Sequence, residues 1–215
     1  MVEVRRVTAG DAVLLDPASR EWNAVRASEL TLRPTPITAQ PSLYVQAKWN
    51  DEPYGILARL AVRAAHDGAR LYFRLFWMDE TNNEGIRDTD QFADAAAVLF
   101  PVNSDAPLQS MGSPEAPVNA WYWRADLEDP LSITAQGTGT TRRTQDTELQ
   151  AQGHHSNGAW NLVICRRLAS SGEGYISLTP GVSGKVGFAV WQGANQERGG
   201  LKAATLEWEP LEIEA

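Results

Sequence analysis

The sequence predicts an all-β protein, an antiparallel β-sandwich of the immunoglobulin-like type with few short helices. Many short strand-like segments are separated by Gly, Pro, Asn and Asp, as in sandwiches and closed barrels. No stretch keeps a helical period of apolar residues over three turns. The length of 215 residues, 43% of them apolar, suits one large domain with a sizeable core. We therefore expect residues 1–215 to form a single domain.

The clearest element is a hairpin. Residues 70–77 alternate, so that Leu71, Phe73, Leu75 and Trp77 fall on one face of a strand. Residues 57–65 are also strand-like, and His66-Asp67-Gly68 supplies a turn between the two.

The remaining predicted strands follow the same reading. They are residues 43–49, 95–101, 118–124, 131–135, 159–166, 185–192 and 205–213. Two long connections lie between them, at residues 102–117 and 193–204. Long loops on a β scaffold are where binding residues usually sit, so we expect the functional residues there.

Composition excludes several classes of protein. Nineteen Lys and Arg stand against 27 Asp and Glu, a net charge of −8, which argues against a nucleic-acid partner. The longest apolar run, residues 95–100, is far too short to span a membrane. The chain has no Gly-rich phosphate loop and no Gly-x-Ser-x-Gly nucleophile elbow. Nothing indicates an enzyme that acts on its own.

Cys165 is the only cysteine. One cysteine cannot form an internal disulfide or a Cys₄ metal site, and the Cys-x-x-Cys-His motif of covalent haem attachment is absent. Because it follows the apolar run Leu162-Val163-Ile164, we interpret Cys165 as a small core residue.

Met111 lies in the first long connection, before the aromatic strand that contains Trp121 and Trp123. A thioether is a soft, neutral ligand that suits iron and favours its reduced state. The alternative is a loop methionine that packs on the sheet.

Lys202 lies in the second long connection, after Gly199 and Gly200. A lysine binds a metal only as the neutral amine, which burial favours. The alternative is a solvent-exposed loop lysine. His154 and His155, in a polar stretch interpreted as an exposed turn, remain rival ligands, whereas His66 belongs to the predicted hairpin turn.

Two further groups of residues have two readings each. Asp79, Glu80, Asp88, Asp90 and Asp94 suit a calcium site or paired catalytic carboxylates, although their spacing is not that of an EF-hand; a solvated, turn-capping loop is the other reading. Of the eight tryptophans, five fall in predicted strands and either form the core or line a flat pocket: Trp121, Trp123, Trp160, Trp191 and Trp208.

Four segments resemble the γ subunits of the type II branch of the dimethyl sulfoxide reductase family, and most of all those of ethylbenzene dehydrogenase and steroid C25 dehydrogenase. The segments are residues 92–101, Met111-Gly112 with residues 117–123, residues 158–166, and residues 188–193 leading through Glu197-Arg198 to Lys202. They occur in the family's order across residues 40–213, and their combination is more specific than any one of them.

This resemblance implies a cytochrome-domain-like sandwich whose loops form a pocket for one non-covalent haem b. The family's haem lies between a methionine and a lysine, which match Met111 and Lys202. Lys185 is the rival for the second position, and Trp121 and Trp123 are expected to contact the cofactor. The chain differs from the family in having Leu201 where a basic residue precedes the lysine.

The resemblance also implies an electron-transfer role in an αβγ heterotrimer. The α subunit carries the molybdenum cofactor and oxidises a hydrocarbon or steroid, and the β subunit carries the iron–sulfur clusters that pass electrons to this haem. An external acceptor then takes the electrons. The expected location is the periplasm. Arg5-Arg6 is not followed by the apolar stretch of an export signal, so we expect co-export with the α subunit.

A carbohydrate-binding module without haem is the competing interpretation, because such modules share the β-sandwich and use tryptophans. A structural subunit that has lost its haem site is a third. The three interpretations differ in whether the protein carries haem.

Overall fold

The computed structural model describes residues 1–86, 90–103, 106–170 and 174–215. Strands make up 40% of the structure and helices 11%, which confirms an all-β fold with few short helices. The helical segments are α1 (Asp11–Leu14), η1 (Arg20–Ala24), η2 (Ile37–Ala39), α2 (Leu43–Trp49) and η3 (Gly193–Asn195). The strands are β1 (Val2–Arg6), β2 (Ser28–Thr31), β3 (Arg33–Pro34), β4 (Arg59–His66), β5 (Arg70–Met78), β6 (Ala95–Pro101), β7 (Val118–Arg124), β8 (Leu131–Ala135), β9 (Arg142–Gln145), β10 (Gln150–Ser156), β11 (Ala159–Arg167), β12 (Gly184–Trp191), β13 (Ala203–Ala204) and β14 (Glu209–Ile213).

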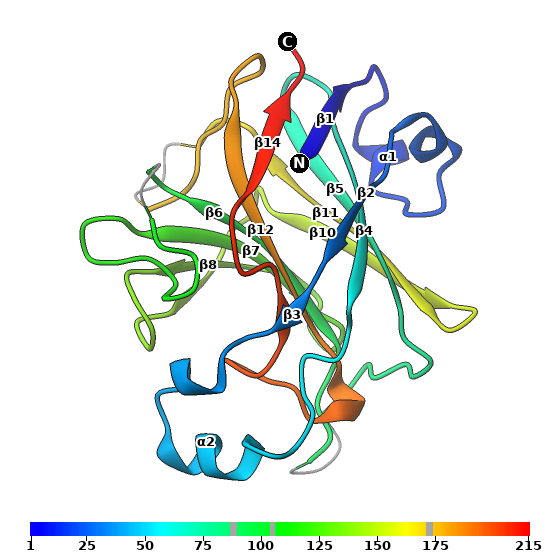
Figure 1. The fold of residues 1–215 in the computed structure, drawn as a ribbon. Helices are drawn as coiled ribbons and strands as arrows, with labels where there is room; N and C mark the ends of the chain where they lie inside the picture. Colours follow the sequence, from blue (N-terminus) through cyan, green and yellow to red (C-terminus); the bar gives the residue numbers. More distant parts are fainter. Residues whose placement is uncertain (87–89, 104–105, 171–173) are drawn as a thin grey trace.

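The strands pair in one continuous order, β10-β11-β5-β4-β1-β14-β12-β6-β7-β8-β9. This path folds over into the two layers of a sandwich, which Figure 1 shows with β5 and β11 in one layer and β6, β7 and β8 in the other. β12 belongs to both layers, because residues 184–186 pair with β14 and residues 187–191 pair with β6.

The hairpin predicted around residues 66–68 is confirmed. β4 and β5 pair antiparallel, and Gly68 takes the positive φ of 93° that the turn requires. The Asp67 carboxylate accepts hydrogen bonds from the backbone N–H groups of Ala69 at 2.8 Å and Arg70 at 2.7 Å. A turn aspartate of this kind fixes the register of the hairpin.

The sequence predicted an antiparallel sandwich, and the structure differs at one strand. β1, which was not predicted, lies between β4 and β14 and is parallel to both, while the other paired strands that the structure describes are antiparallel. Val2 and Val4 alternate with exposed residues and are fully buried against the core. Burial of these two side chains holds a strand whose five residues are otherwise polar.

The prediction of a strand at residues 43–49 is wrong, because this segment is the helix α2. The Ser42 hydroxyl accepts from the Val45 backbone N–H at 3.4 Å, so the helix begins with an N-cap. Leu43 and Tyr44 remain 79% and 76% exposed. The segment has apolar residues but no neighbouring strand, so local hydrogen bonds decide its structure.

Two other predicted boundaries change. Residues 152–158 were interpreted as an exposed turn. Residues up to Ser156 instead belong to β10, and the turn is confined to Asn157 and Gly158, both with positive φ. The strand expected at residues 205–213 is shorter, because only β14 (Glu209–Ile213) lies in this range, and the two-residue strand β13 precedes it.

The main core fills the space between the two layers and is rich in aromatic rings. The ring centres of Trp77 and Trp160 lie 6.1 Å apart in a stacked arrangement, and those of Trp123 and Trp160 lie 4.9 Å apart, edge to face. The ring centres of Phe100 and Trp121 lie 4.8 Å apart. A large side chain buried in this way stabilises a fold by about 1.5–3 kcal/mol. These rings make the sandwich a rigid platform for whatever lies on its outer faces.

Cys165 is a buried core residue, as predicted. Burial raises the pKa of its thiol to about 12, so the thiol is a poor nucleophile at neutral pH. In the described residues, no helix has the length and apolar character needed to cross a bilayer.

Candidate functional site

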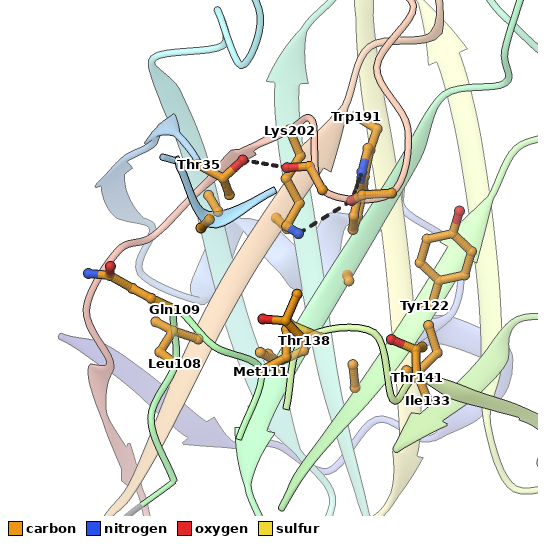
Figure 2. A pocket seen from close by; sticks show the side chains of 18 of the residues that line it. Thr35, Leu108, Gln109, Met111, Tyr122, Ile133, Thr138, Thr141, Trp191 and Lys202 are labelled. Carbon is orange, nitrogen blue, oxygen red and sulfur yellow. Dashed lines mark hydrogen bonds between the residues drawn. The ribbon is translucent and has the colours of Figure 1, made fainter. Parts of the chain in front are cut away.

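A cavity of about 320 Å³ lies on the outer face of the layer formed by β6, β7, β8, β12 and β13, on the side away from the main core. Four loop segments surround it: residues 35–41, residues 108–111, residues 138–143 and residues 199–206. Figure 2 shows these side chains converging above the strands. Both long connections singled out in the sequence therefore contribute to one site.

The alternation of β6 explains why the cavity is apolar. Ala96, Val98 and Phe100 face the main core, whereas Ala97 and Leu99 face the cavity. The strand is buried on both faces, which is why its sequence is a continuous apolar run rather than an alternating one.

Small side chains form the floor of the cavity. Ala97, Ala120, Ala189 and Ala204 come from four adjacent strands and all line it. Tyr122 and Trp191 stand at one side with their rings 5.6 Å apart and nearly perpendicular. A floor of methyl groups leaves room for a flat, apolar group.

Met111 enters the cavity from the loop between β6 and β7. Its backbone φ is +60°, and Gly112 follows with +85°, so two successive residues are left-handed. Two backbone hydrogen bonds hold the turn. The Met111 N–H donates to the Leu108 carbonyl at 3.0 Å, and the Gly137 N–H donates to the Met111 carbonyl at 3.0 Å. A left-handed conformation costs a side-chain-bearing residue about 1–2 kcal/mol. Strain of this kind concentrates at functional sites.

Gly112 is required by its surroundings. A Cβ at this position would lie 2.8 Å from the Ala116 carbonyl oxygen and 3.0 Å from the Ala135 carbonyl oxygen. These are backbone atoms that cannot move independently of the sheet. The glycine therefore allows the loop to fold back onto the strands and to present Met111 to the cavity.

Lys202 enters the same cavity from the loop before β13, opposite Met111 and Thr138 in Figure 2. Its Nζ lies 5.3 Å from the centre of the Trp191 ring and donates a long hydrogen bond of 3.4 Å to the Gly199 carbonyl. Desolvation lowers the pKa of the amine from 10.5 to about 8. The desolvated site thus makes the neutral amine, the form that can act as a ligand, easier to reach by loss of a proton than it is for a lysine in water.

Buried polar contacts fix the backbone around Lys202. The Thr35 N–H donates to the Lys202 carbonyl at 3.1 Å, and the Gln40 amide donates to the Gly200 carbonyl at 3.0 Å. The Glu197 carboxylate is 1% exposed and accepts from the backbone N–H groups of Gly55 at 2.7 Å and Gln192 at 3.0 Å. Desolvation raises the pKa of Glu197. Sequence reasoning did not identify Glu197 as a positioning residue.

The donor set suits a haem iron. A thioether and an amine of depressed pKa enter one apolar cavity from opposite sides, and its floor is built of small residues. Neutral donors on the two faces of a flat macrocycle are how proteins hold six-coordinate haem.

Lys185, the rival of Lys202, does not line this cavity. It is the second residue of β12, four residues before Ala189, and pairs with Pro210 of β14. Leu108 and Trp208 pack close to Gly187, which lies between Lys185 and Ala189 on this strand.

The histidines also lie elsewhere. His154 and His155 belong to β10, at the far end of the other layer, and the His155 ring hydrogen-bonds the Asp79 carbonyl at 2.8 Å. His66 is buried at the end of β4. None of the three lines the cavity.

Trp121 and Trp123 do not line the cavity either. Both point into the main core, because they occupy the alternate positions of β7. The cavity-facing residues of this strand are Ala120 and Tyr122. The aromatic residues that line the cavity are thus Tyr122, which sequence reasoning missed, and Trp191, which it left as either core or pocket. The alternation of side chains along β7 would have been the signal for Tyr122.

The acidic residues after β5 do not form a metal site in the described part of the chain, where no three His, Cys, Asp or Glu residues gather. Asp94 is buried and accepts from the Trp160 indole at 3.0 Å and the Gly193 N–H at 2.8 Å, so it joins a core ring to the β12–β13 loop. Asp88 lies outside the described residues.

Solved structures with the same fold include a family 9 carbohydrate-binding module from Caldicellulosiruptor kristjanssonii, in complexes with glucose and with cellotriose. The match has TM-scores of 0.52 and 0.53 and covers 99% of this chain and 95% and 93% of the module. The sequences are only 10% and 11% identical, so the likeness concerns the fold alone.

Three relatives match by sequence. The "Chlorate reductase subunit gamma" of Ideonella dechloratans is 37% identical over 97% of this chain and 82% of its own length. The "Putative respiratory nitrate reductase heme subunit ORF7" of Haloferax mediterranei is 38% identical over 89% and 66%. The "Dimethylsulfide dehydrogenase subunit gamma" of Rhodovulum sulfidophilum is 34% identical over 69% and 58%.

The sequence model described as ethylbenzene dehydrogenase matches residues 19–148 and 141–203, which together contain both Met111 and Lys202. This match covers most of the chain and agrees with the resemblance read from the sequence. The chain belongs to the ethylbenzene dehydrogenase family.

Proposed function

We propose that this chain binds one non-covalent haem b between Met111 and Lys202 and serves as an electron-transfer subunit. The observation that carries the proposal is the meeting of these two residues, from two separate long loops, in one apolar cavity. When bound, the haem supplies a one-electron carrier. Residues of this chain would supply the ligands, position them and keep water away from the cofactor.

Each residue has a defined task. Lys202 provides an amine that loses its proton more readily than a lysine in water, because desolvation lowers its pKa, and the contacts of Glu197 and Thr35 keep its loop in place. Met111 provides a soft donor that favours the reduced state of iron. The alanine floor and the Tyr122 ring exclude water from the face of the cofactor. The name of the Haloferax mediterranei relative, which includes a heme subunit, supports this assignment.

We further propose that the chain acts in an αβγ heterotrimer in the periplasm. In this arrangement a molybdenum-containing α subunit oxidises a hydrocarbon or steroid and provides the export signal. An iron–sulfur β subunit passes the electrons to this chain, and an external acceptor receives them. The names of the chlorate reductase and dimethylsulfide dehydrogenase relatives, both gamma subunits, support a role within a larger complex. Residues 1–215 then act as one domain, since β12 belongs to both layers.

A carbohydrate-binding role is less well supported by the residues. Such modules present exposed tryptophans to the sugar, whereas all eight tryptophans here are buried or half-buried. A subunit that has lost its haem site would be under no constraint to keep a strained methionine opposite a desolvated lysine.

The axial pair is tested by substitution. Lys202→Ala should open a coordination position that carbon monoxide or imidazole fills, and Met111→Ala should lower the reduction potential or release the haem. Lys185→Ala and the double variant His154→Ala/His155→Ala are the controls and should leave the absorption spectrum unchanged. An unaltered six-coordinate spectrum in Lys202→Ala, with a changed one in either control, would show that the second ligand is assigned incorrectly.

A further inference from the structure

The charged side chains that line the cavity are positive, although the chain as a whole is acidic. Of 27 Asp and Glu residues in the sequence, none is among the described residues that line it. Two lining residues are cationic, Lys202 and Arg143. Lys202 is committed to the iron in the proposed function. Arg143 is left as a permanently charged group at a site otherwise built of apolar and uncharged side chains.

Arg143 lies at one rim of this cavity. It belongs to β9, where it pairs with the cavity residue Ile133 of β8. Its guanidinium group lies 6.0 Å from the centre of the Tyr122 ring, another cavity residue. Arg143 takes part in none of the ion pairs found among the described residues. Its donors are therefore available to an anion.

The rim around Arg143 combines a fixed positive charge with hydroxyl groups, whereas the other polar lining residues apart from Lys202 are uncharged: Thr35, Gln40, Gln109 and Thr205. Thr138 and Thr141 add hydroxyl groups beside it, on the segment between β8 and β9. Leu99, Leu108 and Phe188 line the cavity elsewhere and offer no charge or hydroxyl. A ligand with an apolar body and an anionic edge would match this division.

We infer that Arg143 binds the carboxylate-bearing edge of the tetrapyrrole and so sets the orientation of the cofactor in its plane. The inference rests on the proposed haem function. Haem b carries two propionate carboxylates on one edge of an otherwise apolar ring. A guanidinium group pairs with a carboxylate through two parallel hydrogen bonds, which gives direction as well as affinity. The Thr141 hydroxyl can donate to the same groups, whereas the Thr138 hydroxyl donates to the Ser110 carbonyl at 3.3 Å.

The test compares two ligands and two arginines. Haem and haem dimethyl ester, in which the carboxylates are neutral, are titrated into the haem-free full chain, and the Soret absorption is followed. Arg143→Gln is the test variant. Arg142→Gln is the matched control, because Arg142 neighbours it on β9 but faces the other side of the strand.

The wild-type protein should prefer haem over the diester by roughly several-fold to tenfold, as for a partly exposed charged pair. High salt should weaken the preference. Arg143→Gln should remove it, Arg143→Lys should retain part of it, and Arg142→Gln should leave it intact.

Two kinds of result would contradict the inference in different ways. If the wild type binds haem but Arg143→Gln keeps the wild-type preference, or Arg142→Gln loses it equally, the assignment of Arg143 is wrong while the proposed haem function stands. If the wild type binds neither ligand, both proposals are overturned.

Discussion

At the residue scale, the ligand role of Lys202 depends on its protonation. The amine is desolvated and its pKa is lowered to about 8, so below that pH a proton must leave before the nitrogen can bind iron. Haem affinity should therefore rise by about tenfold per pH unit up to the pKa and level off above it. The measurement is haem transfer between this protein and albumin, from well below to well above that pH.

Lys202→Ala is the control for this dependence. Without the amine, the affinity should be weaker and should lose the rise that ends near the lysine pKa. An equal rise in Lys202→Ala would mean that another group titrates, and that Lys202 is not the ligand.

Gly112 carries a second prediction at this scale. Gly112→Ala forces a Cβ against two backbone carbonyl groups at a positive φ, which should lower the free energy of unfolding by about 1–3 kcal/mol and speed the release of haem. Urea unfolding and haem-release kinetics provide the measurements. Gly68→Ala is the control, since Gly68 also has a positive φ but nothing within 4 Å of its added Cβ. It should lose about 1 kcal/mol and release haem normally. Similar release rates in both variants would contradict the account.

The family resemblance predicted Met111 and Lys202 as ligands, and both line the cavity, whereas Trp121 and Trp123, predicted to contact the cofactor, do not line it. That prediction came from the resemblance, because composition alone fits an ordinary loop methionine and an exposed loop lysine as well. Trp121 and Tyr122, in contrast, differ only in the face of β7 that they occupy, and both faces are buried. When a strand is apolar on both sides, its sequence does not say which side is the core. Arg143 was missed because an exposed arginine has no distinguishing sequence signal.

At the scale of the element, successive side chains of β6 point alternately into the cavity and into the main core. Ala97→Leu fills the cavity floor and should abolish haem binding while leaving the free energy of unfolding nearly unchanged. Ala96→Leu enlarges a side chain in the packed core and should cost about 1–3 kcal/mol of stability. The two neighbours are compared by haem titration and by urea unfolding. Haem binding unaffected by Ala97→Leu would exclude this face as the cofactor site.

The elements show where sequence reasoning succeeds. The bounds of β6, β7 and β8 agree with the predicted strands, because β-branched, aromatic and small apolar residues end at clear turn residues there. The prediction for α2 failed because Leu43, Tyr44 and Trp49 resemble a strand in composition, whereas the Ser42 cap decides for a helix. β1 and β9 were missed because short polar strands depend on their neighbours for pairing.

At the scale of the whole molecule, α2 exposes apolar surface next to the cavity. The Gln46 amide donates to the Gln40 carbonyl at 2.7 Å, which ties the helix to a cavity-lining residue, and Leu43 and Tyr44 stay exposed. We propose that the iron–sulfur subunit docks here, because an electron donor must approach the haem closely. Figure 1 shows α2 at the end of the molecule opposite to the two termini.

This docking is tested by a pull-down of the complex. Leu43→Glu/Tyr44→Glu should reduce co-purification of the iron–sulfur subunit and leave the haem spectrum intact. Val182→Glu, at an exposed apolar residue in the turn before β12, is the control and should co-purify normally. Equal recovery of the partner with both variants would locate the interface elsewhere.

The most direct test of the central claim is the visible absorption spectrum of the protein isolated with its native partners, recorded oxidised and then reduced. Six-coordinate ligation by Met111 and Lys202 predicts a low-spin haem spectrum whose bands sharpen on reduction, with about one haem for each copy of this chain. A preparation that contains the complete complex but has no haem absorption attributable to this chain would contradict the account.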